Sequence, residues 1–368
     1  MDNSATAYLK LIADYNANLD KYEQRRPKTG SLTAFLDDTQ LIGGGVGIIA
    51  QDEYNRVARA GFSPNGTAIP VIDFQGISVT QGGLTTCTAS TVAGDTALVD
   101  VSYQKISFDL KMPKKTGDED FNYVKLGSSM QRALMARRDA VLNYLNQLCL
   151  TQLESEKNLV LTDALLGFWS DGGGAFEVAT AKQNDFFNYL RMSMAQMNFE
   201  GNYKFIGNAS AFASLVNPQF AQGTGNSVNL GYNFGRETAP IQGTNVMGAD
   251  FSWYLDTQLV NEVGVLATGF AVPTGSLAII SSPDRELFPQ SGVGRAGNNE
   301  LSTVSLPGLE GIDFGLKYVS DCEANGRDGG LIGLYDSWQF ETSIALITPY
   351  NSDPALRAGA INKYQVVS

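Results

Sequence analysis

The sequence contains one segment with the glycine spacing of a nucleotide-binding turn. Gly292, Gly294 and Gly297 match the pattern G-x-G-x-x-G. That pattern binds a dinucleotide when a strand leads into it and a helix begins at its end, because the pyrophosphate then meets the helix N-terminus. The flanking residues 288–291 (Phe-Pro-Gln-Ser) and 298–300 (Asn-Asn-Glu) predict neither element. The sequence therefore predicts no nucleotide site here.

Other residue types that perform chemistry are absent or scattered. The chain has no histidine, which removes the commonest general base near neutral pH and the commonest metal ligand. Cys87, Cys149 and Cys322 lie far apart, without zinc-ligand spacing, and their odd number does not favour a disulfide framework. The 38 acidic residues leave a carboxylate pair open for acid–base chemistry, but no particular pair is favoured. We therefore predict a protein that is not an enzyme, with no catalytic residue, cofactor or metal.

The composition is that of a sizeable acidic protein. The 368 residues are 43% hydrophobic and 17% charged, enough to form the core of one large or two modest domains. Most of the net charge of −12 falls on residues 159–368, which hold 10 basic and 20 acidic residues. Nonspecific nucleic-acid binding needs a dense basic surface, which this chain lacks. Residues 1–4 do not resemble a secretory signal, and no apolar run is long enough to span a membrane, so we expect a soluble protein made in a cytosol.

The N-terminal part combines a short helix with an irregular segment. Tyr8, Tyr15, Leu19 and Tyr22 recur at helical spacing, and Pro27 ends the pattern. Residues 29–66 contain Gly43–Gly45, Gly47 and the turn Pro64-Asn65-Gly66. We expect an amphipathic helix followed by a loop-rich arm.

Residues 69–112 alternate as strands do. Val99, Val101 and Tyr103 alternate with polar residues, and Ile106 and Phe108 continue the alternation in the opposite phase. A strand has a period of two, so a change of phase at Gln104-Lys105 exchanges the buried and exposed faces. We interpret the change as a bulge or twist within a long projecting hairpin that presents two faces to apolar partners.

The longest predicted helix runs from Ser128 to Lys157. Its apolar residues form one stripe, and no Gly or Pro interrupts it. At about 1.5 Å per residue it would be a rod of roughly 45 Å. Arg132, Arg137 and Arg138 lie in its first half, where they predict a face that is either solvated or engaged in salt bridges between subunits.

The remaining residues alternate helices and strands. We predict a helix around 186–197, a strand at 203–206, and a short helix capped by Asn208. An exposed loop is predicted over 218–245. Strands are predicted at 251–255, 263–267, 277–280, 312–319 and 338–347.

This order of elements resembles the major capsid proteins of tailed phages with the Hong Kong 97-type fold, an α+β fold. The resemblance covers nearly the whole chain but rests on element order and not on a motif. It implies an N-terminal arm, an E-loop hairpin, a P-domain with a long spine helix, and an A-domain. The corresponding ranges are 1–60 for the arm, 61–127 for the E-loop region, 128–180 for the P-domain, 181–302 for the A-domain and 303–368 for returning strands of both domains.

The resemblance implies a structural protein that assembles as hexamers and pentamers into an icosahedral shell around phage double-stranded DNA. Its partners would be other copies of itself, a separate scaffold protein and possible decoration or portal proteins, with weak DNA contact and no membrane. It would reside in the virion after assembly in the host cytoplasm. The residues predicted to contact neighbouring subunits are Val99, Val101, Tyr103, Ile106, Phe108, Arg132, Arg137 and Arg138.

Two alternatives stay open from the sequence. The 15 Tyr and 3 Trp, with Gly- and Asn-rich loops, also suit a carboxylate-based glycan-active or ligand-binding α+β protein. A different virion component, such as a tail or portal protein, is the other alternative.

Overall fold

The computed structural model describes about three fifths of the chain. The described residues are 28–43, 51–52, 54–55, 67–72, 96–113, 123–159, 169–171, 174–196, 199, 201–216, 241–246, 249–283, 294–296, 299–306, 309, 311–323, 334–349 and 360–368. The helix predicted near the N-terminus lies outside them. No helix among these residues is long and apolar enough to cross a membrane.

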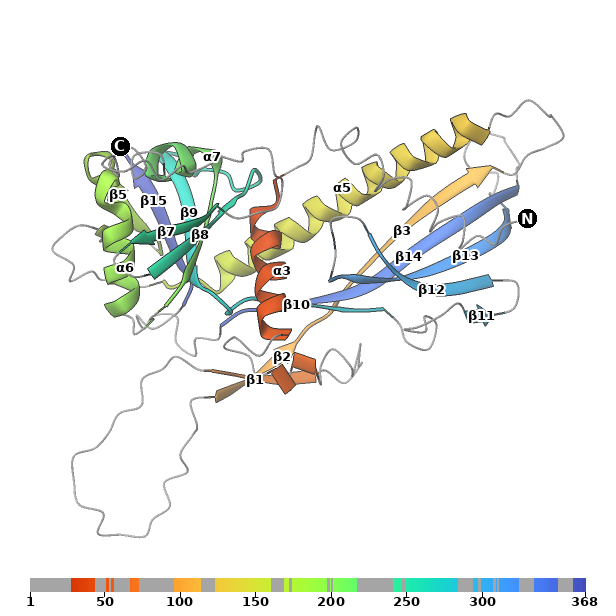
Figure 1. Cartoon of the computed structure of the whole chain (residues 1–368), viewed down its shortest axis with the longest axis horizontal. Helices are drawn as coiled ribbons and strands as arrows, with labels where there is room; N and C mark the ends of the chain where they lie inside the picture. Colours follow the sequence, from red (N-terminus) through yellow and green to blue (C-terminus); the bar gives the residue numbers. More distant parts are fainter. Residues whose placement is uncertain are drawn as a thin grey trace, which may run out of the picture.

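One end of the molecule is a mixed seven-stranded sheet (Figure 1). Its strands, in spatial order, are β4 (Trp169–Asp171), β5 (Phe176–Ala179), β15 (Asn362–Val367), β9 (Val265–Pro273), β6 (Tyr203–Gly207), β8 (Ala249–Leu255) and β7 (Ile241–Val246). The last strand in sequence, β15, lies inside the sheet, parallel to β5 and antiparallel to β9. The C-terminal residues are therefore part of this sheet's core.

Both faces of this sheet are covered. The helix α6 (Phe186–Gln196) packs Phe186 and Leu190 against one face, beside Phe205 of β6. The next residue of β6, Ile206, points to the opposite face and joins the cluster formed with α3 and α5. Because side chains alternate along a strand, a strand covered on both sides buries its residues on both faces, and every residue of β6, including Lys204, is buried.

The other end is a six-stranded antiparallel sheet. Its strands are β10 (Ala278–Ser282), β14 (Leu334–Ile347), β13 (Asp313–Glu323), β12 (Asn299–Ser305) and β11 (Gly294–Ala296), with β3 (Gln104–Pro113) paired to the free side of β14. The helix α5 (Tyr123–Ser155) runs along this sheet (Figure 1). Its 33 residues make a rod of about 50 Å.

The buried stripe of α5 explains why the helix lies on the sheet. Leu134, Val141 and Leu145 recur at helical spacing and share a core with Leu110 of β3 and Phe340 of β14. The predicted long helix is confirmed, although it begins five residues before Ser128, at Tyr123.

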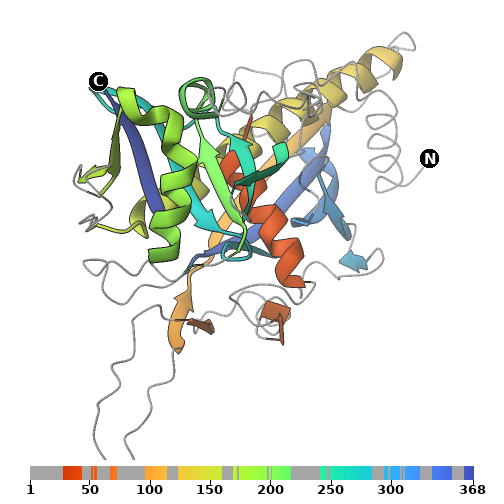
Figure 2. The ribbon, with the colours of Figure 1, turned by 60° about the vertical axis from the view of Figure 1, so that its left-hand side comes forward.

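A third, two-stranded sheet is formed by β1 (Thr67–Ile72) and β2 (Thr96–Val101). The pairing is antiparallel, with Thr67 opposite Val101 and Ile72 opposite Thr96. Figures 1 and 2 show this hairpin on the lower side of the molecule, outside both larger sheets. The hairpin is thus a separate element of the fold.

The helix α3 (Gly30–Gly43) lies between the two large sheets (Figures 1 and 2). It buries Leu32, Phe35 and Ile42 and contacts α5, β6, β8 and β10. The prediction of a loop-rich arm over residues 29–66 is therefore wrong for residues 30–43. The glycines at 43–45 do mark an end of an element, since α3 ends at Gly43.

The rest of the chain follows the predicted elements with local differences. The α+β class is confirmed, as are α6, β6 and the strands β8, β10, β13 and β14. The predicted loop over 218–245 is wrong at its end, because β7 begins at Ile241. The short elements are the 3-10 helix η2 (Thr180–Asp185), α7 (Ala209–Ala211) and the π-helical turn η3 (Phe212–Val216).

The predicted ranges of the capsid-type domains stay a prediction, but the structure shows how strands are shared between sheets. Of the strands within residues 181–302 or at their edge, β10 pairs with β14, β12 pairs with β13, and β11 pairs with β12, so none of these three pairs with β6 or β9. The chain crosses from one sheet to the other between β9 and β10, and again between β14 and β15. Both large sheets are therefore built from distant parts of the sequence.

Candidate functional site

The alternating residues on either side of Gln104 belong to different sheets. β2 ends at Val101 and pairs with β1, whereas β3 begins at Gln104 and pairs with β14. The change of phase that we interpreted as a bulge in one long hairpin is thus the passage between two sheets. The alternation changes phase because the two segments have different neighbouring strands and therefore bury different faces.

The predicted contact residues of β3 pack inside the subunit. Ile106 is buried in the core under α5. The ring of Phe108 stacks on Phe340, with centroids 4.6 Å apart, and meets Phe314 edge-on. The apolar alternation of β3 therefore has an intrachain cause.

The predicted contact residues of β2 lie in and beside the hairpin. Val99 pairs with Ile69 in the register of the two strands. Val101 and Tyr103 pack against a small cluster that includes Ala278 and Ile347, from strands β10 and β14. These contacts fix the base of the hairpin to the six-stranded sheet.

The three predicted arginines of α5 do not share one surface. Arg132 and Arg137 are exposed, and neither has an ion-pair partner among the residues that the structure describes. The side chain of Arg138 is only 2% exposed and lies 2.9 Å from the Asp139 carboxylate. Only Arg132 and Arg137 are thus available on the solvent face of the helix.

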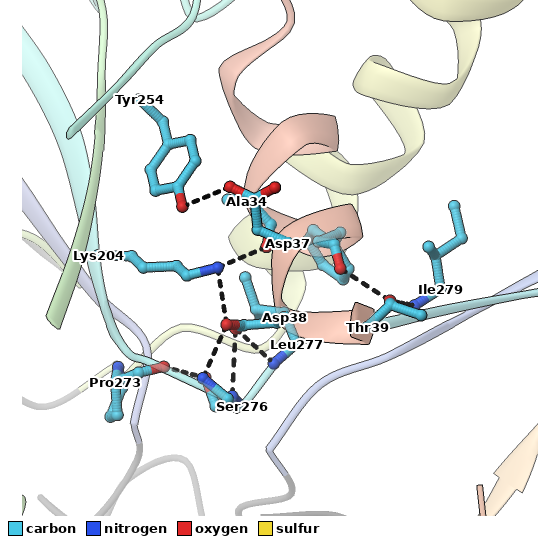
Figure 3. Close-up of polar contacts among 12 residues, drawn as sticks. Ala34, Asp37, Asp38, Thr39, Lys204, Tyr254, Pro273, Ser276, Leu277 and Ile279 are labelled. Carbon is cyan, nitrogen blue, oxygen red and sulfur yellow. Dashed lines mark hydrogen bonds and ion pairs between the residues drawn. The ribbon is translucent and has the colours of Figure 1, made fainter. Parts of the chain in front are cut away.

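A buried ion pair, which sequence reasoning missed, lies where α3 meets the seven-stranded sheet (Figure 3). Lys204 Nζ of β6 is 2.6 Å from an Asp38 carboxylate oxygen, and the side chains are 2% and 0% exposed. Lys204 also donates to the Ala34 carbonyl oxygen, at 2.8 Å. Tyr254 donates a hydrogen bond from its hydroxyl to Asp37, at 2.8 Å.

Asp38 also fixes the crossing between the sheets. Its carboxylate accepts hydrogen bonds from the backbone N–H groups of Gly275, Ser276 and Leu277, at 2.7, 3.2 and 3.1 Å. These residues join β9 to β10, and Gly275 has a φ of 82°, a conformation that favours glycine. Burial raises the pKa of Asp38, while Lys204 and the backbone donors oppose the shift. One carboxylate thus joins α3, β6 and the connection between the two sheets.

A second buried carboxylate holds the start of α3. Asp256 accepts from the Ser31 backbone N–H and hydroxyl, at 2.9 and 2.7 Å, and from the Asn146 amide nitrogen at 2.9 Å. The Asn146 side-chain oxygen in turn accepts from the Leu32 N–H at 2.9 Å. A helix begins with unpaired N–H groups, and here distant side chains satisfy two of them. This arrangement ties α3 to the middle of α5.

The chemistry-bearing residue types form no recognisable reaction centre in the described part of the chain. No group of three His, Cys, Asp or Glu side chains there could hold a metal ion. Cys149 is buried, and burial raises the pKa of its thiol well above the usual value, which keeps the thiol protonated and inert. The described residues of the G-x-G-x-x-G segment form the short strand β11, and the next described residues, from Asn299, form the strand β12.

The comparisons with known proteins give matches among solved structures. No protein-family model matches the sequence, and no curated protein does. A chain from Mycobacterium phage Che8 is 10% identical, with a TM-score of 0.45, over 86% of this chain and 89% of that one. The capsid of the native GTA particle is 11% identical, with a TM-score of 0.41, over 91% of each chain. The holo-SrpI encapsulin complex from Synechococcus elongatus is 8% identical, with a TM-score of 0.35, over 83% of each.

The chain is similar to these structures in its arrangement of elements. They include a phage chain, a particle capsid and an encapsulin. The geometry of the chain's own elements is the basis for considering what it does.

Proposed function

We propose that this chain is the major capsid protein of a tailed phage and assembles, as hexamers and pentamers, into an icosahedral shell around double-stranded DNA. The observation that carries the proposal is the β1–β2 hairpin. It forms a two-stranded sheet of its own, outside the two large sheets. An isolated two-stranded sheet is marginally stable in water, so an element of this kind is suited to lie on a neighbouring subunit.

The rest of the subunit supports the proposal because it is braced as one body. α5 provides a stiff rod of about 50 Å along the six-stranded sheet, and α3 joins that sheet to the seven-stranded one through Asp38 and Asp256. A shell needs subunits that keep their shape when they contact their neighbours. The hairpin would then adapt the same subunit to rings of five and six.

The exposed arginines of α5 are candidates for contacts between subunits. Arg132 and Arg137 have no described ion-pair partner, and the chain carries a net charge of −12. The acidic surface of a neighbouring copy would supply their partners. The net negative charge would also make contact with packaged DNA weak, because the affinity for phosphates rises with the number of available cations. Arg138 would act within the subunit through Asp139.

Further partners follow from the capsid role. A separate scaffold protein would guide assembly, and decoration or portal proteins would join the shell. The proposed role is structural, requires no cofactor, and places the chain in the virion after assembly in the bacterial cytoplasm.

The test is to express the full chain, alone and together with a candidate scaffold protein, and to examine the product by sedimentation and negative-stain electron microscopy. Closed shells, or hexamers and pentamers, are the expected result. A strictly monomeric species under both conditions would overturn the proposal. Tubes or single rings would instead indicate a tail or portal component, and glycan turnover would indicate the ligand-binding alternative.

A further inference from the structure

The connection between β8 and β9 presents aliphatic side chains to solvent. Val260 is 78% exposed, Val263 is 106% exposed, and Leu266, near the start of β9, is 49% exposed. One exposed aliphatic residue is ordinary on a protein surface, but two on one short loop, with a third just inside the next strand, point to an interaction site, here called the patch. Leu259 of the same connection packs against the hydrophobic core. The loop is therefore anchored on one side and apolar on the other.

The loop is held in place by hydrogen bonds to several elements. Gln258 donates from its backbone to Asp256, at 2.9 Å, and from its side chain to Asn143 of α5, at 2.7 Å. Asn261 donates to the Leu266 carbonyl oxygen, at 2.8 Å, and accepts from Asn208. A contact made by a braced loop loses little conformational entropy on binding. Val260 and Val263 are thus presented in a fixed arrangement.

The charges around the patch compensate one another. Lys363 Nζ lies 2.6 Å from a Glu262 carboxylate oxygen and 3.1 Å from a Glu154 oxygen, and Lys157 pairs with Glu154. These two lysines and two glutamates carry no net charge together. Among the residues that the structure describes, Lys157 and Lys363 are thus paired, and neither is an uncompensated cation for the phosphates of a nucleic acid or for anionic lipid headgroups.

The same charge balance suits contact between copies of this chain. Each copy carries a net charge of −12, so copies repel one another over most approaches. A neutral apolar patch is a place where two copies can meet without bringing net negative charge together.

We propose that Val260 and Val263 form a contact with a second copy of this chain. The inference rests on the proposed function and adds to it a named surface, distinct from the hairpin and the arginines of α5. Every copy carries the same loop, so the contact repeats around a ring when copies are related by rotation. The β8–β9 loop is rigid, whereas the hairpin is a projecting element. A ring of copies would therefore have a fixed contact at the loop and an adaptable contact at the hairpin.

The test compares two double variants of the full chain. Val260→Asp with Val263→Asp places charge on the patch, and Val260→Ile with Val263→Ile keeps it apolar at the same positions. Val260 and Val263 are both exposed, so both double variants should fold. Circular dichroism and the unfolding midpoint would verify this. We expect the isoleucine variant to assemble like the unaltered chain. The aspartate variant should remain as folded subunits, its association weakened by about tenfold or more per contact.

The outcomes separate this inference from the proposed function. Particle formation by the aspartate variant at the same protein concentration as the unaltered chain would overturn the contact and leave the capsid role intact. Normal particles that have lost their DNA would also overturn it, because they would assign the patch to nucleic acid. Failure of the unaltered chain itself to assemble would overturn the proposed function, and the contact with it.

Discussion

The α3 junction and the β1–β2 hairpin differ in where their partners come from. At the junction, Asp38 and Asp256 each accept hydrogen bonds from more than one distant element. In the hairpin, the described strands pair with each other and with no third strand. The junction is complete within one chain, whereas the hairpin's stability depends on what it lies against. A shell subunit needs both properties: a body that folds alone and an element that is completed by assembly.

Lys204→Met should break the junction most severely. The substitution leaves the Asp38 carboxylate buried without its cation, and removing one partner of a buried pair costs about 3–5 kcal/mol in the free energy of unfolding. Urea denaturation of the full chain measures the loss. Lys105→Met is the matched control, since Lys105 makes an exposed ion pair with Glu341 and should change stability by less than about 1 kcal/mol. Equal losses in the two variants would show that the buried pair does not brace the junction.

Phe108→Ala should change the stability of the subunit body, whereas Val99→Asp should change the assembly contact made by the hairpin. Phe108 stacks on Phe340 inside the subunit, so its truncation should lower the free energy of unfolding by about 3 kcal/mol. Val99 lies in the hairpin strand β2, so Val99→Asp should leave that free energy within about 0.5 kcal/mol of the original while abolishing assembly. Denaturation and sedimentation of both variants check this. A stable, assembling Val99→Asp variant would remove the hairpin from the contact surface.

Asn146→Ala should weaken the junction by an intermediate amount. The change removes a donor to Asp256 and the acceptor of the Leu32 N–H group. Each buried group left unpaired costs about 1–3 kcal/mol, and we expect a total near 2 kcal/mol because water can enter beside the smaller side chain. Asn143→Ala, one turn earlier on α5, removes only the bond from Gln258 and should cost less. The two unfolding midpoints in urea decide the order.

The sequence predicts the elements whose pattern is local. The apolar stripe of α5 follows helical spacing from Leu134 to Leu153, and Asn208 caps α7 by accepting from the Ala211 N–H at 2.8 Å, as its residue type indicates. The alternation in β3 is also visible. Its pairing with β14 is not, because period-two alternation identifies a buried face and says nothing about which strand lies alongside.

The junction was not predictable for a related reason. Leu32, Phe35, Thr39 and Ile42 do follow helical spacing, but the glycines around α3 and the adjacent acids Asp37 and Asp38 favour a loop. A buried aspartate looks like a surface residue until its partners are known. Those partners, on β6 and beyond β9, are distant in sequence and share no motif with α3.

Glu262→Gln should have the smallest effect and tests the outer edge of the body, beside the β8–β9 connection. The hydrogen bond from Lys363 lowers the pKa of Glu262, against the opposing effect of partial burial. A carboxyl group with a lowered folded-state pKa stabilises the folded chain above its unfolded pKa, near about 4.3. That stabilisation disappears as the pH falls through the folded-state pKa.

At neutral pH the substitution should cost less than about 0.5 kcal/mol, because Glu262 is 61% exposed and water screens the pair. The difference between Glu262→Gln and the unaltered chain should shrink toward zero as urea midpoints are measured stepwise from neutral to acidic pH. A Lys363→Met background is the control, since it removes the cation and with it the pH dependence of the difference. A difference that stays constant with pH would mean that Glu262 acts through shape and not charge. The β8–β9 connection would then be held by the hydrogen bonds of Gln258 and Asn261, without a contribution from the charge of Glu262.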